Sequence, residues 1–180
     1  MKKHIKRLFT MAAFPLAAWA AETPQAPAAA QGPTDPQIAA IVVTANNVDI
    51  AAGKMAKKQT KDPEVKKFAE KMVTDHSAVN KSATDLASKL KLKLEENETS
   101  KGLQKSGDEA MLKIKSLKGK DFDKAYVDNE VIYHQTVLDA IDKTLIPSAK
   151  NAELKGLLSQ VRPNIAAHLD HAKHLQATMK

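Results

Sequence analysis

Apolar residues recur every three or four positions along four long segments of the chain, which is the spacing of amphipathic helices. The second segment opens with Asp62 and Pro63, a typical helix cap followed by proline at the first helical position. We expect it to form a helix of about seven turns with one imidazole in its buried face. That face advances in steps of four and three residues, through Val65, Ala69, Met72, His76, Val79, Ala83, Leu86 and Leu90.

The same spacing predicts three further long helices, and the last two carry His134 and His168 in their apolar faces. Pro163 lies inside the last pattern, where proline costs about 3 kcal/mol of helix propensity and predicts a kink one turn before His168. The expected bounds of the four helices are 36 to about 58, with Thr34 or Asp35 as the cap; 63 to about 92; 121 to 147, with Asp121 as the cap and a break at Pro147 and Ser148; and 148 or 151 to about 175.

Short connections join the first helix to the second and the third to the fourth, so each pair should form an antiparallel hairpin. About 28 residues separate the second helix from the third, which is too many for a simple turn. Residues 93–106 are polar and lack a strong cap, while residues 108–117 suggest one short helix. No long stretch alternates with period two, so no sheet is expected. The prediction is an all-α protein, a ferritin-like up-down four-helix bundle with a long, helix-containing crossover between helices two and three.

The N-terminus has the features of a secretory signal peptide. Positive residues at 2, 3, 6 and 7 precede an apolar run at 8–18, and Ala18-Trp19-Ala20 supplies the small residues of a cleavage site. The run is shorter than the roughly 20 residues of a membrane-spanning helix, which favours cleavage over anchoring. We therefore expect a signal peptide at 1–20, a Pro- and Ala-rich flexible linker at 21–35 and a helical domain at 36–180. The expected location is the periplasm, with or without association to the outer membrane.

Removal of the expected signal peptide changes the charge of the chain. The sequence has 28 Lys and Arg against 21 Asp and Glu, a net charge of +7, and four of the 28 lie in residues 1–20. The other 24 give a net charge of +3, and only 4% of all residues are aromatic, so a nucleic-acid partner is not expected. The chain contains no cysteine, so no disulfide stabilises it after export.

Three sequence elements resemble a known bacterial family. They are FAEKMVTDH at 68–76, DFDKAYVDNEVIYH at 121–134 and HLDHA at 168–172, and the resemblance extends over nearly all of residues 36–175. The family is domain-of-unknown-function family 4142, which has a ferritin-like fold and whose members are often labelled outer membrane proteins. The resemblance implies an exported four-helix bundle and brings no established activity.

Histidines and carboxylates on the buried faces of different helices are candidate metal ligands. The candidates are Asp49 on the first helix, His76 on the second, Glu130 and His134 on the third, and His168 on the fourth. Zinc, copper and iron all accept imidazole and carboxylate, so a divalent transition metal is the candidate cofactor. The alternative is that each histidine is a packing residue whose ring nitrogens bond a neighbouring Asp, Glu or Tyr.

The spacing of these residues departs from that of two-metal helical bundles, in which Glu-x-x-His pairs recur. Glu130 and His134 are four positions apart, and Asp75 points about 100° away from its neighbour His76 around the helix. At about 1.5 Å of rise per residue, His168 is expected nearer the level of Glu130 than of His134, which divides the candidates between two layers. These features argue against a di-iron oxidase centre.

Two further groups of basic residues lie outside the buried faces. His171 and His174 fall on other sides of the last helix, where we expect them in solvent or, alternatively, in a surface metal site of modest affinity. Seven lysines between 54 and 71 crowd the expected turn between the first two helices. They either form a solvated end or contact an anionic membrane surface.

No motif in the sequence indicates catalysis, because it has no nucleophile next to a base, no glycine-rich phosphate loop and no cysteine pair. The leading hypothesis is a non-catalytic envelope protein, stress-related or interaction-mediating, with metal-ion binding. Its partner would be another envelope protein or the anionic membrane surface, and its oligomeric state is left open. The alternative is a ferritin-like metal-dependent oxidase or metal-storage protein. Convergence of acids and histidines inside the bundle is the feature that discriminates between the two.

Overall fold

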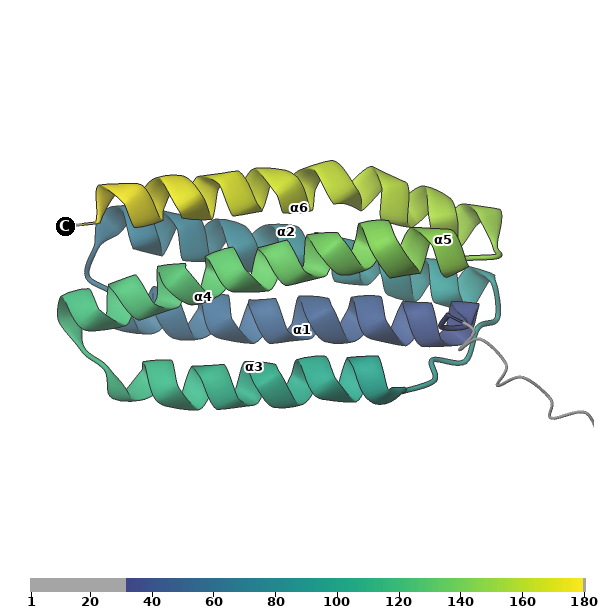
Figure 1. Cartoon of the computed structure of the whole chain (residues 1–180), viewed down its shortest axis with the longest axis horizontal. Coiled ribbons are helices and arrows are strands. Elements are labelled where there is room, and N and C mark those ends of the chain that lie inside the picture. The colour runs from purple at the N-terminus through teal and green to yellow at the C-terminus, as the bar shows by residue number, and fades with distance from the viewer. Residues whose placement is uncertain (1–31, 180) are drawn as a thin grey trace, which may run out of the picture. The chain divides into compact units, whose positions relative to one another are not determined.

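The computed structural model describes residues 32–179, and every long segment in this range is a helix (Figure 1). No strand occurs among these residues, which confirms the all-α prediction. The expected signal peptide at 1–20 and residues 21–31 of the expected linker lie outside the described residues. Within 32–179, no helix combines the length and the apolar character needed to cross a membrane.

Helices α2 and α6 begin close to their predicted starts, and a capping side chain precedes each of them. Oδ1 of Asp62 accepts hydrogen bonds from two backbone N–H groups of the first turn of its helix, at 2.9 and 3.1 Å. Oδ1 of Asn151 does the same at the start of the last helix, at 2.9 and 3.1 Å. The bounds are α1 Asp35–Gln59, α2 Pro63–Lys89, α3 Glu98–Ser116, α4 Gly119–Ala140, the π-helical turn η1 Ile141–Leu145, α5 Ile146–Ser148 and α6 Ala152–Thr178.

Helix α3 is longer than predicted, because it begins at Glu98 and not at 108. The Asn97 side chain accepts a hydrogen bond from the N–H of Ser100 at 2.9 Å, and Oγ of Ser100 accepts one from the N–H of Asn97 at 3.0 Å. This reciprocal capping box starts the helix inside a stretch that is polar overall. The connection between α2 and α4 is therefore mostly helical.

Helix α4 begins at Gly119, so Asp121 lies in the first turn and is not the cap that the sequence suggested. The φ angle of Gly119 is +56°, a left-handed conformation that glycine adopts without steric conflict. This residue lets the chain reverse between α3 and α4. Asp121 still favours the helix, because a carboxylate in the first turn interacts well with the helix dipole.

Near Pro147, where a break was predicted, the helix changes from α-helical to π-helical hydrogen bonding, and it ends at Ser148. In η1 the N–H of Ile146 bonds to the carbonyl of Ile141, five residues back, and α5 follows directly and ends at Ser148. Proline lacks an N–H, and its ring crowds the carbonyl four residues before it, which the wider turn accommodates. Helix α6, by contrast, continues through Pro163 without a break.

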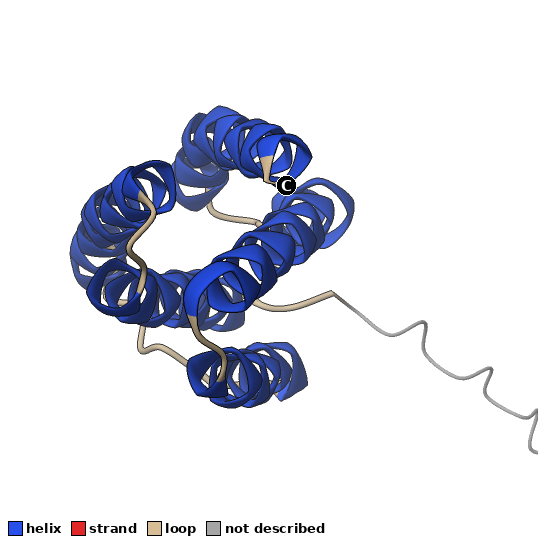
Figure 2. Ribbon diagram, turned by 90° about the vertical axis from the view of Figure 1, so that its left-hand side faces the viewer, coloured by secondary structure: helices blue, strands red, loops and turns tan. Residues whose placement is uncertain are grey.

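The long helices lie side by side (Figures 1 and 2). Helices α1 and α2 form one antiparallel pair, α4 and α6 form another, and α2 also contacts α6. Helix α3 packs mainly on α1 and more lightly on α4. Its close approach to α1 depends on Gly107, where a Cβ atom would lie only 2.4 Å from Cγ1 of Val48.

A layer of polar side chains divides the core in two. One hydrophobic cluster lies toward the α1–α2 turn and includes Phe68 and Tyr126, and the other lies toward the start of α1 and includes Ile38 and Leu158. Between the two clusters, helices α1, α2, α4 and α6 each contribute buried polar residues. This polar layer consists of Asn46, Asp49, His76, Glu130, His134 and His168.

The substitution Leu158→Ala should lower the free energy of unfolding by about 2–5 kcal/mol, because Leu158 is fully buried. Urea unfolding followed by circular dichroism measures the change. Leu112→Ala is the matched control: Leu112 is 71% exposed, and its loss should change stability by less than about 0.5 kcal/mol. Equal effects of the two substitutions would contradict the packing described.

Candidate metal centre

The structure brings the five predicted ligand residues together in the polar layer. Asp49 comes from α1, His76 from α2, Glu130 and His134 from α4, and His168 from α6. None of them is more than 3% exposed. The hydrophobic stripes of the helices therefore point all five side chains into one region of the core.

The prediction that these residues fall in two layers is wrong for the histidines. The ring centroids are 5.5 Å apart for His76 and His134, 5.3 Å for His76 and His168, and 5.5 Å for His134 and His168. The prediction allowed a start of the last helix at 148 or 151, and only the start at 148 is too early. His134 lies 14 residues before the end of α5 at 148, and His168 lies 16 residues after the start of α6 at 152, so their levels nearly match.

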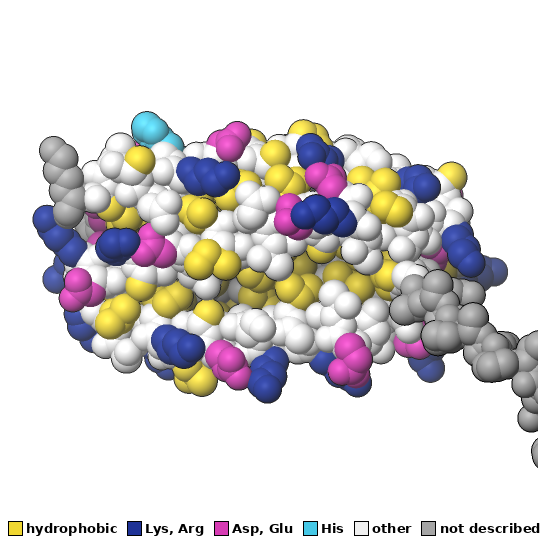
Figure 3. Space-filling view, in the orientation of Figure 1, with side chains coloured by type: hydrophobic (Ala, Val, Ile, Leu, Met, Phe, Trp, Pro, Cys, Tyr) yellow, Lys and Arg dark blue, Asp and Glu magenta, His cyan; other side chains and the backbone are white. Residues whose placement is uncertain are grey.

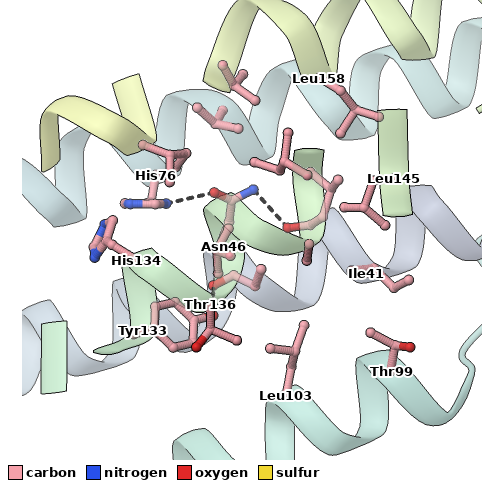
Figure 4. Close-up of a pocket in the computed structure, with 18 residues that line it drawn as sticks. Ile41, Asn46, His76, Thr99, Leu103, Tyr133, His134, Thr136, Leu145 and Leu158 are labelled. Atoms are coloured by element: carbon pink, nitrogen blue, oxygen red, sulfur yellow. Dashed lines mark hydrogen bonds between the residues drawn. The ribbon is translucent and has the colours of Figure 1, made fainter. Parts of the chain in front are cut away.

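Asn46 fixes the orientation of the His76 ring. The amide nitrogen of Asn46 donates to the carbonyl of Val42 at 2.8 Å, so its oxygen is the atom that faces His76. Nδ1 of His76 therefore donates to Oδ1 of Asn46, at 2.8 Å (Figure 4). The neutral ring then presents the lone pair of Nε2 to Oδ2 of Asp49, at 3.1 Å. Asn46 was not among the predicted residues of the site, although it lies about one turn before Asp49 on the same helix.

Glu130 holds the His134 ring in a similar way. Nδ1 of His134 lies 3.0 Å from the backbone carbonyl oxygen of Glu130 and 3.3 Å from its carboxylate oxygen Oε2. Both oxygens are acceptors, so Nδ1 donates and Nε2 is left facing Oδ2 of Asp49, at 3.3 Å. One carboxylate oxygen of Asp49 thus faces a nitrogen from each of two rings.

Asp75 positions His168 from outside the polar layer. Its Oδ2 accepts hydrogen bonds from Nε2 of His168 at 2.8 Å and from Nζ of Lys71 at 2.5 Å. Neither hydrogen bond joins Asp75 to its neighbour His76, in line with the predicted direction of the Asp75 side chain around the helix. It was not predicted that this direction leads to His168 on α6. The other ring nitrogen of His168, Nδ1, is buried.

Six atoms of the polar layer are buried and have no hydrogen-bond partner of suitable geometry among the described residues. Leaving a buried polar atom without a partner costs about 1–3 kcal/mol, so their concentration in one place requires an explanation. They are all atoms that can bind a metal cation. The six are Oδ1 and Oδ2 of Asp49, Oε2 of Glu130, Nε2 of His76, Nε2 of His134 and Nδ1 of His168.

Burial and neighbouring charges shift the pKa values of His76, His134 and Asp49 by different amounts and in different directions. Burial lowers the pKa of His76 to about 3, and the neighbouring His134 and His168 contribute. Burial also disfavours the charged form of His134, but hydrogen bonding to Glu130 and the charges of Asp49 and Glu130 outweigh it and raise the pKa of His134 to about 9. Burial, followed by the charge of Glu130, raises the pKa of Asp49 well above its usual value. In the metal-free protein, the raised pKa of His134 favours its protonated form next to Asp49 and Glu130.

A cavity of about 390 Å³ between α1, α3 and α4 reaches the carboxylates of the layer. Asp49 and Glu130 lie at its inner side, while Glu98, Gly102 and Ser106 line it along α3 and are exposed. The cavity therefore connects the surface of α3 with the acidic side of the polar layer.

The groups expected in solvent are exposed, with one exception. His174 is exposed, whereas His171 is half-buried with its ring edge-on to Phe68, at 5.0 Å between centroids. The seven lysines between 54 and 71 are all exposed, and two of them pair with carboxylates of α2. Their contact with an anionic membrane surface remains a prediction.

These observations define an all-helical protein whose core contains a layer of histidines and carboxylates. The chain belongs to the family described as domain of unknown function (DUF4142), whose sequence model matches residues 20–175. This match confirms the family resemblance carried by the three sequence elements. Comparison with curated proteins and with solved structures finds no match.

The metal-free protein should lose stability as the pH rises from 6.5 to about 9. The pKa of His134 is about 9 in the folded protein against 6.5 for an ordinary histidine, so the folded state binds more protons in this range. The resulting stabilisation is complete below pH 6.5 and declines by roughly 3 kcal/mol as the pH passes through 9. Urea unfolding in the presence of a chelator measures this decline.

His134→Gln should flatten the decline, because it removes the titrating group. The exposed His174 provides the matched control, and His174→Gln should keep the pH dependence of the parent protein. Constant or increasing stability of the parent between pH 6.5 and 9 would contradict the charge assigned to His134.

Proposed function

We propose that this protein is an exported envelope protein that binds a divalent transition metal ion within its helical core. The ligands are His76, His134, His168 and Asp49, with Glu130 as a further ligand. The site is non-catalytic in this proposal, and the bound ion links four helices. The accompanying fold is a ferritin-like up-down bundle of α1, α2, α4 and α6, in which α3 is the crossover between the second and third bundle helices.

One observation carries the proposal: each of the three histidines has one ring nitrogen held by a protein acceptor and the other turned into the layer. The acceptors are the Asn46 side chain for His76, the Glu130 carbonyl for His134 and the Asp75 carboxylate for His168. Metal-binding histidines have this arrangement, because the outer hydrogen bond fixes the tautomer and makes the ligating nitrogen more basic. A histidine that only packs in the core needs partners for both nitrogens.

The distances in the layer support ligation of a single ion. With metal–ligand bonds of about 2.1 Å, two ligands of a tetrahedral site lie about 3.4 Å apart. Oδ2 of Asp49 lies 3.1 Å from the facing nitrogen of His76 and 3.3 Å from that of His134. Ligand atoms of His76, His134 and His168 lie within 4.8 Å of one another, so a modest side-chain movement would bring all three into one coordination shell.

The charge of the layer also favours a dication. Asp49 and Glu130 are each 1% exposed, and two buried carboxylates need compensation by positive charge. A divalent ion supplies it without protonation of His134. Mixed imidazole and carboxylate ligands suit zinc, iron or copper(II), whereas magnesium and calcium prefer oxygen ligands alone.

A second candidate function rests on Asp49, Glu130 and His134, whose ligand atoms also lie within 4.8 Å of one another. A second ion at this group would favour a metal-dependent oxidase or a metal-storage protein over a single-ion binding protein. The ratio of metal to protein distinguishes the two, because the leading proposal requires one ion per chain and the alternative requires two.

The proposal is tested by metal analysis and thermal unfolding of the protein isolated from an envelope fraction without affinity tag or chelator. The isolated chain should have the mass of a protein that begins at Ala21. Zinc, iron or copper should raise the melting temperature of the metal-free protein, corresponding to about 2.7 kcal/mol at a free concentration a hundred times the dissociation constant. The effect should weaken as the pH falls below about 9, because the pKa of His134 is about 9 in the metal-free protein and its ligating nitrogen must lose that proton.

Two variants locate the site. His76→Ala should abolish the metal-induced stabilisation, and His174→Ala should retain it, because His174 is exposed on α6 outside the layer. If none of the three metals stabilises the parent protein, or if the two variants behave in the opposite way, the buried site is refuted and the histidines are structural residues.

A further inference from the structure

An apolar cavity of about 120 Å³ lies beside the polar layer, on the side away from the α1–α2 turn (Figure 4). The rings of His76 and His134 lie at one end of the cavity, and the rest of its wall is largely aliphatic. Its aliphatic lining includes Ile41, Ile141, Leu145, Leu158 and Ile165. It therefore combines a hydrophobic chamber with the edge of the candidate metal centre.

Three polar side chains in the cavity wall, those of Asn46, Tyr133 and Thr136, have partners within the protein. The Asn46 amide donates to the Val42 carbonyl and accepts from His76. The Tyr133 hydroxyl donates to a carbonyl of α1 at 2.8 Å, and the Thr136 hydroxyl donates to a carbonyl of its own helix at 2.8 Å. A buried water needs two to four polar partners, whereas a cavity with aliphatic walls favours an apolar occupant.

The helix that forms one wall is irregular at the cavity. Ile141 and Leu145 are the first and last residues of η1, and both line the chamber. A π-helical turn in an α-helix is rare and is frequent at functional sites. The π-helical turn η1 therefore forms part of the cavity wall.

We propose that this cavity binds a small, uncharged, apolar molecule, which contacts the rings of His76 and His134. Aliphatic cavities of roughly 150 Å³ take up benzene or xenon, so the chamber suits an occupant of that size or smaller. Thr99 on α3 and Thr136 on α4 line the chamber and are exposed, which places the approach between these helices. Hydrophobic side chains are visible along this side of the molecule in Figure 3. The proposal goes beyond metal binding and does not require a bound ion.

Xenon is the probe, and methyl resonances of the mature protein report on its position by NMR. In metal-free protein, increasing xenon pressure should produce saturable shifts at the methyl groups of Ile141, Leu158 and Ile165. The methyl groups of Val65 and Val127 should not shift, because these residues lie in the other hydrophobic cluster and do not line the cavity. This comparison within the parent protein is decisive even without a variant.

A matched pair of substitutions on α4 tests the location. Ala140 lines the cavity and Ala125 packs against the other cluster, and both are half-buried. Ala140→Leu should fill the chamber and abolish the xenon shifts, and Ala125→Leu should preserve them. The proposal is overturned if the parent shows no saturable shift at the cavity methyl groups, if both clusters shift equally, or if a folded Ala140→Leu protein still binds xenon.

Discussion

The structure depends most on the burial of Asp49 between two imidazole rings. Its carboxylate is 1% exposed and faces nitrogens from α2 and α4, so one side chain of α1 connects three helices. A carboxylate in a hydrophobic core must be protonated, paired with a positive group or bound to a cation. The Asn46 hydrogen bond leaves Nε2 of His76 facing this carboxylate, and the charge of Asp49, after the hydrogen bond with Glu130, contributes to the raised pKa of His134.

The positive charge opposite Asp49 can come from a proton on His134 or from a bound metal ion, but not from both at once. Without a metal, a proton on His134 provides the positive charge opposite Asp49 and Glu130. A bound dication would provide it instead and would need the His134 nitrogen unprotonated, so metal affinity should rise as the proton becomes easier to remove. The two hydrophobic clusters on either side of the layer bury the apolar faces of the helices, and this burial supplies the main stabilisation of the fold.

Sequence reasoning succeeded where the signal is local. The cap at Asp62 and the apolar stripes gave the bounds of α2 and the buried positions of His76, His134 and His168. The first half of α3 was not predicted. The buried residues of α3 as a whole, Ser100, Gly107 and Ile114, are seven positions apart and mostly not apolar. The three histidines lie at the same height along the bundle because of where α6 begins relative to η1 and α5. Counting residues from predicted turns does not give this offset between α4 and α6. Asn46 was not predicted, and Asp75 was considered only with respect to its neighbour His76, because the histidine partner of each lies on another helix.

X-ray absorption spectroscopy at the metal K edge tests the proposed centre most directly, because it reports the ligands of the ion itself. For the protein loaded with one equivalent of zinc, the site predicts nitrogen and oxygen ligands at about 2.0–2.2 Å and outer-shell scattering from three imidazole rings. The His168→Gln variant should lose one of the three rings. A shell of oxygen ligands alone, or one with a single imidazole, would contradict a centre built from His76, His134, His168 and Asp49.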